Sequence, residues 1–310
     1  MATNDSRSFT AGKYALDLDG KFAGWIQSVE GGYATADVVV EKVATDLIWH
    51  KHIAGVKYDD ITLNCGTAMS KAFYEWIQAS VDHNAKRITS GAVISGDYNF
   101  KETGRLNFFN ALISEVGFPA LDAASKDAAK MSLKFAVETT RQITATGAAI
   151  NGDLGKMEQK KWTPANFALA IDGFSTAPKW INKIEALTIK QKVVDNPLGE
   201  FRDFQKEPAH VEFPNLVVTV AESHADEFYK WHEDFVIKGN CDQGHEKGGS
   251  LTYLASDTKT ELFTITFQGL GIFSAKPEKS ESASENIKRV KFEMYCEQLH
   301  FKPGSSSIFA

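Results

Sequence analysis

Two short stretches carry side chains that could bind a metal ion or take part in catalysis. His50 and His52 are two positions apart, so on a strand both would lie on one face and could bind one metal ion. A structural zinc site needs about four ligands, and no further Cys or His lies at a convincing spacing. The second stretch holds four reactive or charged residues: Cys241, Asp242, His245 and Glu246. The glycines and polar residues around them indicate a surface loop instead of a catalytic centre.

No other pattern in the sequence predicts catalysis. Asp19 and Asp172 each precede a glycine, which is typical of a turn in which the aspartate bonds its own backbone. The phosphate-binding pattern G-x-x-x-x-G-K-[ST], the dinucleotide pattern G-x-G-x-x-G and the hydrolase pattern G-x-S-x-G are all missing from the chain. The sequence therefore predicts no catalytic residue, no cofactor-binding residue, no metal ligand and no cofactor, so we expect a protein that is not an enzyme.

Composition bounds the class of protein. The chain has 310 residues, 43% of them hydrophobic and 24% charged, which suits a globular protein with a large core. Its net charge of −6 does not favour a nucleic-acid partner. We expect no membrane segment, because no window approaches the ~20 apolar residues that a spanning helix needs, and no secretory signal. Three widely separated cysteines, Cys65, Cys241 and Cys296, are typical of reduced thiols.

The sequence repeats itself. Four of the six tryptophans pair at one offset: Trp25 with Trp180, and Trp76 with Trp231, each 155 positions apart. The residues that follow them are also similar, as in "WIQSVE" and "WINKIE". Further matches lie at offsets from 153 to 159, as small loop insertions would produce; one is "MSLKFAVE" with "VKFEMYCE". We infer two copies of one domain.

Each copy is predicted to be mainly β with one α-helix. Alternating apolar residues predict strands on both sides of each helix, and the strands do not alternate with helices as in a doubly wound sheet. We predict two tandem β-barrel or β-sandwich domains, residues 1–148 and 160–310. The glycine-containing stretch from Gln142 to Pro164 joins them and is too short to let the halves separate widely.

The two predicted helices carry one apolar face each. The apolar residues stand at helical spacing: Met69, Phe73, Trp76, Ile77 and Val81 in the first, and Ala225, Phe228, Trp231, Phe235 and Val236 in the second. Phe73, Trp76, Phe228 and Trp231 are predicted to anchor helix to sheet. Thr67 is predicted as the first N-cap, and Ser223 with Asp226 as a start resembling a capping box.

Two loops are also predicted. Residues 274–289 contain Pro, Ser, Glu and Lys and almost no apolar side chain, which indicates a solvated loop. Residues 119–131 are rich in alanine and are predicted to form a short helix.

The stretches Leu16–Gly32 and His52–Gln78 resemble the tube proteins of contractile phage tails and of phage-tail-like contractile injection systems. The similar residues are "SVEG" at Ser28–Gly31, "GVKYDDITLNCG" at Gly55–Gly66 and the aromatic helix pattern at Phe73–Trp76. The resemblance covers residues 10 to 142 well. It is partial in the second half, where the residues that correspond to Lys57-Tyr58 and Ile61–Leu63 differ. The two glycines after "SVE" are replaced there by Ala186 and Leu187.

The resemblance implies a structural protein that forms hexameric rings, stacked into a hollow rod that a contracting sheath drives through a target envelope. The partners would be further copies of the chain, other tube, baseplate and spike proteins, and the surrounding sheath. Because each chain carries two copies of the domain, three chains would form a pseudo-hexameric ring with alternating first and second domains. Assembly in the cytoplasm, as part of a phage-tail-like particle, is the expected localisation.

Two alternatives remain open at this point. One is a tandem β-sandwich binding module that recognises a ligand through its loops. The other is an enzyme with a site between the two domains, which only the cluster at Cys241–Glu246 supports.

Overall fold

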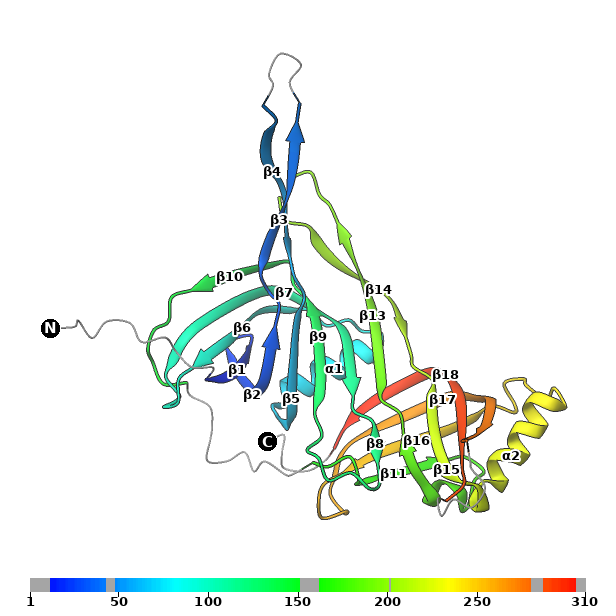
Figure 1. Cartoon of the computed structure of the whole chain (residues 1–310). Coiled ribbons are helices and arrows are strands. Elements are labelled where there is room, and N and C mark those ends of the chain that lie inside the picture. Colours follow the sequence, from blue (N-terminus) through cyan, green and yellow to red (C-terminus); the bar gives the residue numbers. More distant parts are fainter. Residues whose placement is uncertain (1–11, 43–47, 151–161, 201, 280–286, 305–310) are drawn as a thin grey trace.

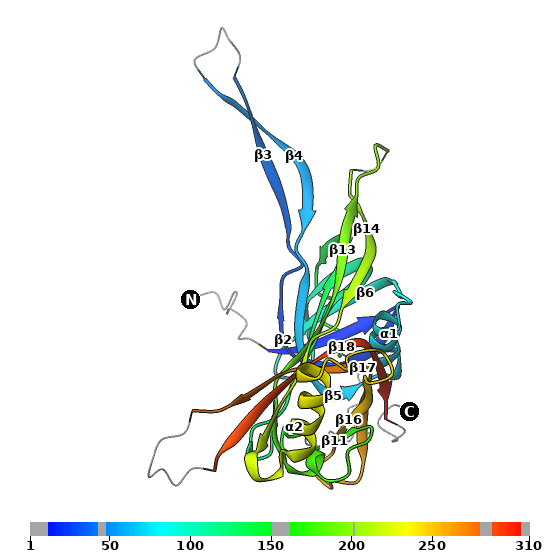
Figure 2. The same ribbon diagram turned by 90° about the vertical axis from the view of Figure 1, so that its right-hand side faces the viewer.

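The chain folds into two β-sheet bodies that lie side by side, with two long hairpins rising from one end (Figures 1 and 2). The structure is a computed structural model, and it describes residues 12–42, 48–150, 162–200, 202–279 and 287–304. We call the elements from β1 to β10 the first repeat and those from β11 to β18 the second repeat.

Six strands of the first repeat close into a barrel. In the order of pairing they are β1 (Lys13–Leu18), β2 (Lys21–Glu30), β5 (Ile61–Met69), β9 (Met131–Ala136), β7 (Glu102–Phe118) and β6 (Ile88–Gly96). The barrel closes because β7 is 17 residues long and bends, so that its first half pairs with β6 and its second half with β9. Strand β10 (Thr139–Ile143) pairs with the first half of β7.

The helix α1 (Lys71–Val81) packs into this barrel through the predicted apolar face. All five predicted residues are buried, and Trp76 lies with its ring centroid 5.3 Å from that of Phe135. The predicted N-cap is wrong: Thr67 belongs to β5, and the side chain of Ser70 accepts the capping hydrogen bond from the Phe73 N–H. The strand runs two residues further than the sequence pattern indicated, so the helix begins later.

The second repeat forms a seven-stranded open sheet. In order it contains β11 (Phe167–Ile171), β16 (Lys247–Leu254), β17 (Glu261–Pro277), β18 (Arg289–Pro303), β15 (Leu216–Ala221), β12 (Ile181–Ile184) and, from the first repeat, β8 (Leu121–Asp122). Helix α2 (Asp226–His232) continues into one π-helical turn (Glu233–Ile237) and packs on β17 and β18.

Three local predictions are wrong, two of them for helix α2 and one for residues 119–131. Helix α2 has no side-chain cap, because Ala225 occupies the N-cap and a 3₁₀ turn (Glu222–His224) precedes it, so that Ser223 bonds to His224 instead. Val236 is 44% exposed, because the π-helical turn rotates it away from the sheet. Residues 119–131 form β8 and turns instead of a helix, because the main chain of Leu121 and Asp122 pairs with β12.

Two predicted loops are only partly described. Residues 274–277 belong to β17 and β18 begins at Arg289, so the predicted loop is wrong at these positions; its residues 280–286 lie outside the described part. Residues 151–161 of the predicted connector also lie outside it.

The strand pairings of the two repeats correspond. The pairs β1–β6, β6–β7, β7–β9, β5–β9 and β2–β5 recur as β11–β16, β16–β17, β17–β18, β15–β18 and β12–β15. The pair β1–β2 has no counterpart. Where β2 would begin, the second repeat has a 3₁₀ helix (Ala177–Trp180), and Pro178 within it cannot donate to a strand ladder. One repeat is therefore a closed barrel and the other an open half-barrel, which confirms two tandem, mainly β domains.

The two long hairpins also correspond residue by residue. The first consists of β3 (Ala34–Glu41) and β4 (His50–Tyr58), the second of β13 (Leu187–Asn196) and β14 (Gln205–Glu212). Val38 pairs with Ile53 and Val193 with Pro208, each 155 positions later, and both hairpins shift register just before this pair. An identical irregularity in both hairpins is strong evidence that one is a copy of the other.

Candidate functional site: assembly surfaces and the junction between the repeats

The second hairpin lies in the sheet of the first repeat. Strand β13 pairs with the end of β7, from Leu187 opposite Phe118 to Lys190 opposite Glu115. We call this pairing the β7–β13 junction. Beside it β8 pairs with β12, so each repeat contributes main chain to the sheet of the other. The side chains of Leu187 and Ile189 are only 1% and 3% exposed there.

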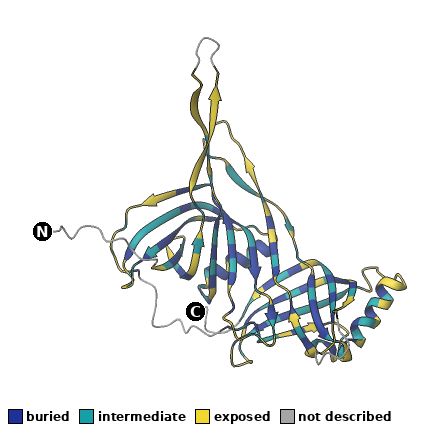
Figure 3. Ribbon diagram, viewed as in Figure 1, coloured by how far each residue is buried: buried dark blue, intermediate teal, exposed yellow. Residues whose placement is uncertain are grey.

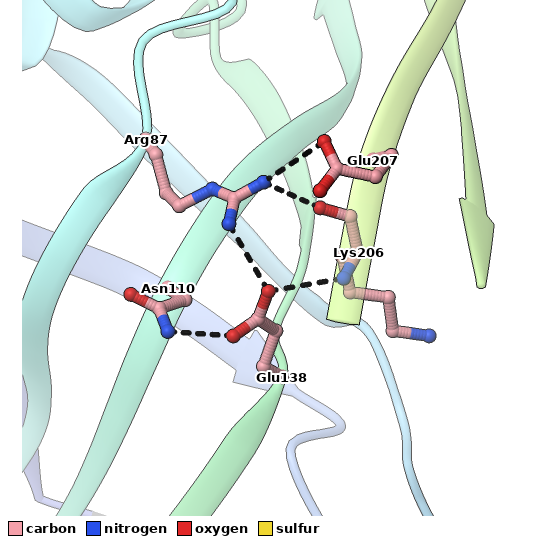
Figure 4. Close-up of polar contacts among 5 residues, drawn as sticks. All are labelled: Arg87, Asn110, Glu138, Lys206 and Glu207. Atoms are coloured by element: carbon pink, nitrogen blue, oxygen red, sulfur yellow. Dashed lines mark hydrogen bonds and ion pairs between the residues drawn. The ribbon is translucent and has the colours of Figure 1, made fainter. Parts of the chain in front are cut away.

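A polar cluster holds the hairpin against the barrel (Figure 4). Glu138, whose side chain is 10% exposed, accepts hydrogen bonds from Arg87 Nη1 at 3.2 Å, the Lys206 main-chain N–H at 3.0 Å and Asn110 Nδ2 at 2.5 Å. Arg87 Nη2 donates to the Lys206 carbonyl at 2.6 Å and to Glu207 at 3.4 Å. A carboxylate that is removed from water needs such donors, since burying it without partners is costly. We call these five residues the Glu138 cluster.

The first hairpin, in contrast, has no sheet beside it. Every residue of β3 is exposed, and β3 and β4 pair only with each other in the described part of the chain (Figure 3). Val38 and Ile53 are 61% and 64% exposed. A two-stranded hairpin alone is only marginally stable, and exposed apolar side chains on it mark a surface that another molecule covers.

In the open half-barrel, a carboxylate stabilises the segment that a strand pairing stabilises in the first repeat. Glu227 of α2 accepts hydrogen bonds from the main-chain N–H groups of Ala177, Ser175 and Thr176 and from the Ser175 hydroxyl. The pKa of Glu227 falls to about 2, chiefly because of the bond from the Ala177 N–H. This carboxylate fixes the 3₁₀ helix that stands where the first repeat has a β1–β2 pairing.

The residues that could have done chemistry do not form a site in the described part of the chain. His50 and His52 lie on the exposed strand β4, and the described residues contain no group of three or more His, Cys, Asp or Glu placed to hold a metal ion. His245 Nδ1 and Asp242 Oδ1 are 2.7 Å apart in an exposed turn, and Cys241 beside them is exposed.

The other singled-out residues are structural. Burial raises the pKa of the Cys65 thiol to about 12, which keeps it protonated. The prediction that Asp19 bonds its own turn is wrong: its carboxylate accepts from the Ser90 N–H at 3.1 Å, because the main chain of Ser90 on β6 is within reach of the turn. The four predicted anchors, Phe73, Trp76, Phe228 and Trp231, are all buried.

The Glu138 cluster could not be found from the sequence. Its members lie between positions 87 and 207, on both repeats, and no spacing links them. The only signal was the duplication, which required some junction between the copies.

The fold defines a tandem, mainly β protein with one closed barrel and one open half-barrel. Residues 10–141 match the family of the T4-like virus tail tube protein gp19. This match lies within the first repeat and covers less than half of the chain. No curated protein matches the chain. The described residues contain no helix that is long and apolar enough to cross a membrane.

Solved structures with a similar fold come from contractile injection systems and related proteins. The cap of the anti-feeding prophage, its tube terminating cap, is 19% identical with a TM-score of 0.38 and covers 47% of this chain and 100% of its own. A chain of the sheath–tube complex of the extracellular contractile injection system PVC, in its extended state, is 15% identical with a TM-score of 0.40 and covers 47% and 99%. Hcp1 from Flavobacterium johnsoniae is 15% identical with a TM-score of 0.27 and covers 44% and 95%.

Proposed function

We propose that the chain is a structural component of a phage-tail-like contractile injection system. It would form part of the inner tube or the adaptor between the tube and the baseplate or spike, and it would be assembled in the cytoplasm. Its role is assembly and not catalysis. The observation that carries this proposal is the match of residues 10–141 to the tail tube family. The repeated strand pairings support the extension to the second half.

The proposed ring consists of three chains. We propose domain boundaries at 1–148 and 160–310, so that three chains supply six domains in alternating order around a channel. The head-to-tail arrangement of two repeats in one chain is consistent with a ring, since a heterologous contact forms a closed ring where its repeated rotation completes a full turn. Further rings, the baseplate, the spike and the sheath are the proposed partners.

The test is the mass and the shape of the purified protein. Light scattering after size-exclusion chromatography should give three times the 34.2 kDa mass of the chain, and electron microscopy should show rings with a central hole and near six-fold outline. A stable monomer that forms neither rings nor rods would contradict the proposal.

A further inference from the structure

The β7–β13 junction joins a strand edge, which we call the acceptor, to the base of a hairpin, which we call the donor. Each repeat contains one acceptor and one donor. The acceptor is the last stretch of β7 with Glu138 beside it, and the donor is the base of the second hairpin with the main chain of Lys206. Within the chain, the acceptor of the first repeat pairs with the donor of the second repeat. The strand registers identify the remaining acceptor, in the second repeat, and the remaining donor, in the first repeat.

The second repeat carries an unused acceptor. Phe108 opposite Gly91 corresponds to Phe267 opposite Gly249, so residues 115–118 of β7 correspond to residues 274–277 of β17. In the described residues β18 pairs with this stretch on one side, and β16 on the other side reaches only Leu270. The hydroxyl of Ser274 is buried there with no hydrogen-bond partner among the described groups.

Glu297 stands where Glu138 stands in the first repeat. Thr139 and Gln298 occupy the same register position, opposite Phe109 and Gln268, so the residues before them correspond. The residues facing them agree as well: Asn110 and Gly269 both have positive φ, 52° and 64°. The carboxylate of Glu138 holds the second hairpin, but that of Glu297 is exposed and forms no hydrogen bond or ion pair with the described residues.

The first repeat carries the unused donor. At the offset of 155 that the two hairpins share, residues 187–190 correspond to residues 32–35, and Lys206 corresponds to Lys51. Ile189 is buried in the junction, whereas its counterpart Ala34 is exposed. Residues 33–35 are exposed, whereas Gly32 is buried and its carbonyl accepts a hydrogen bond from Thr140 Oγ1 at 2.7 Å. The exposed residues 33–35 and the unpaired edge of β17 have matching register and are two halves of one contact.

We propose that a second copy of this chain completes the contact: its exposed hairpin base, residues 33–35, adds as an antiparallel strand to residues 274–276 of β17. The register that follows places Ala34 of one chain opposite Ala275 of the other, and Thr35 opposite Ser274, whose unpartnered hydroxyl gains a hydroxyl neighbour. Glu297 accepts a hydrogen bond from the main-chain N–H of Lys51. The inference rests on the proposed function and adds the surface, the direction and the register of the contact between chains.

The contact already present inside the chain favours a second copy over an unrelated partner. The contact inside the chain already shows that this edge and this hairpin fit, so the second copy continues an existing interface. The donor and acceptor lie on different repeats, and the contact is therefore head-to-tail. Gly31 and Gly32, with φ of 89° and 79°, stand where the second hairpin has Ala186 and Leu187. Glycine allows the hairpin base to change direction when it binds.

Disulfide cross-linking tests the register. In a chain with Cys241→Ser and Cys296→Ser, A34C protein is mixed with A275C protein and oxidised mildly. Facing residues of an antiparallel pair have Cβ atoms about 5 Å apart, and a small adjustment of the main chain brings them to the distance that a disulfide needs. We expect a covalent dimer from the mixture and at least tenfold less from A36C with A275C. The intrachain pair K190C and E115C, at the β7–β13 junction, is the positive control.

A matched pair of carboxylate variants tests the role of Glu297. We expect E297Q to weaken association about tenfold or more, because the acceptor of the hydrogen bond loses its charge, while the melting temperature of the unassembled chain stays unchanged. E138Q should lower the melting temperature instead. Rings that form without the 34–275 cross-link, or that tolerate E297Q, would overturn the inference and leave the proposed function intact. Protein that never forms rings and never cross-links would overturn both.

Discussion

The carboxylate of Glu227 lies where the second barrel lacks a strand pairing. Three main-chain N–H groups and one hydroxyl donate to it, as they would to a bound anion at a helix start. A single side chain of α2 therefore secures a segment that a strand secures in the first repeat. Its contribution depends on ionisation, which makes it measurable by pH.

Replacing Glu227 with Gln should destabilise the protein by about 1 kcal/mol at pH 7, the usual value of a capping interaction on a solvated surface. The pKa of Glu227 in the folded protein is about 2, below its ordinary value of 4.5. The stabilisation is therefore fully present above pH 4.5 and is lost as the pH falls toward 2. Melting curves of the wild type and E227Q should differ at pH 7 and converge near pH 2. A difference that stays constant down to that pH would contradict this assignment.

The ring of Trp76 fills the barrel between α1 and the sheet. It is fully buried, and its Nε1 donates to the Lys86 carbonyl at 2.9 Å. Trp76→Ala should lower the free energy of unfolding by about 3–5 kcal/mol, because it leaves a cavity. Denaturant unfolding measures this loss. Trp180 is 51% exposed, and Trp180→Ala is the control, with an expected change below about 1 kcal/mol. Equal stability of W76A and wild type would refute the anchor role.

The β13–β14 hairpin depends on the Glu138 cluster for its place. Glu138→Gln removes the charge that three donors share, and the expected loss is about 1.5–3 kcal/mol. Amide hydrogen exchange should accelerate in β13 and β14 before it does so in the barrel. Glu207→Gln is the control, since its contact with Arg87 is 3.4 Å long and its side chain 45% exposed. Uniform acceleration throughout both sheets would mean that the cluster does not act on the hairpin.

The β3–β4 hairpin should matter for assembly and not for folding. Ile53 is 64% exposed, so Ile53→Asp should change stability by less than about 0.5 kcal/mol. A charge on a surface that another chain covers is costly, and association should fall at least tenfold. Sedimentation of the variant and the wild type at equal concentration measures this, with Lys57→Gln, near the hairpin base, as a milder change. Full assembly of I53D would exclude the hairpin from the interface.

Local patterns predicted the elements, and distant pairings decided their arrangement. The helical spacing around Phe73 and Trp76 found the buried face of α1, and the repeated tryptophans found the duplication. The sequence did not predict that β13 would join β7, because main-chain pairing between edges leaves no period in the side chains. We also did not predict that Trp180, the counterpart of Trp25, lies on a 3₁₀ helix instead of a strand, although Pro178 two positions earlier disfavours a strand ladder.

At the scale of the whole molecule, the two repeats share one core. Phe118, at the end of β7, lies among the rings of the second repeat, with centroid distances of 6.1, 5.5 and 5.8 Å to Tyr253, Phe263 and Phe301. Strands are also exchanged, since β13 and β14 extend the first sheet and β8 extends the second. Neither repeat can therefore unfold without exposing apolar surface of the other.

Thermal unfolding should consequently be a single transition, despite the duplicated architecture. The unassembled variant I53D is suited to calorimetry, and its calorimetric and van't Hoff enthalpies should agree. Phe118→Ala should lower the midpoint of that one transition, with a loss of about 3–5 kcal/mol, because the cavity lies in the shared core. If the repeats were independent, F118A would split the curve into two transitions, and residues 1–148 would fold alone with the stability of the full chain. In a ring, one cooperative unit per chain means that a contact on either repeat stabilises both, so that closure of the ring strengthens every junction in it.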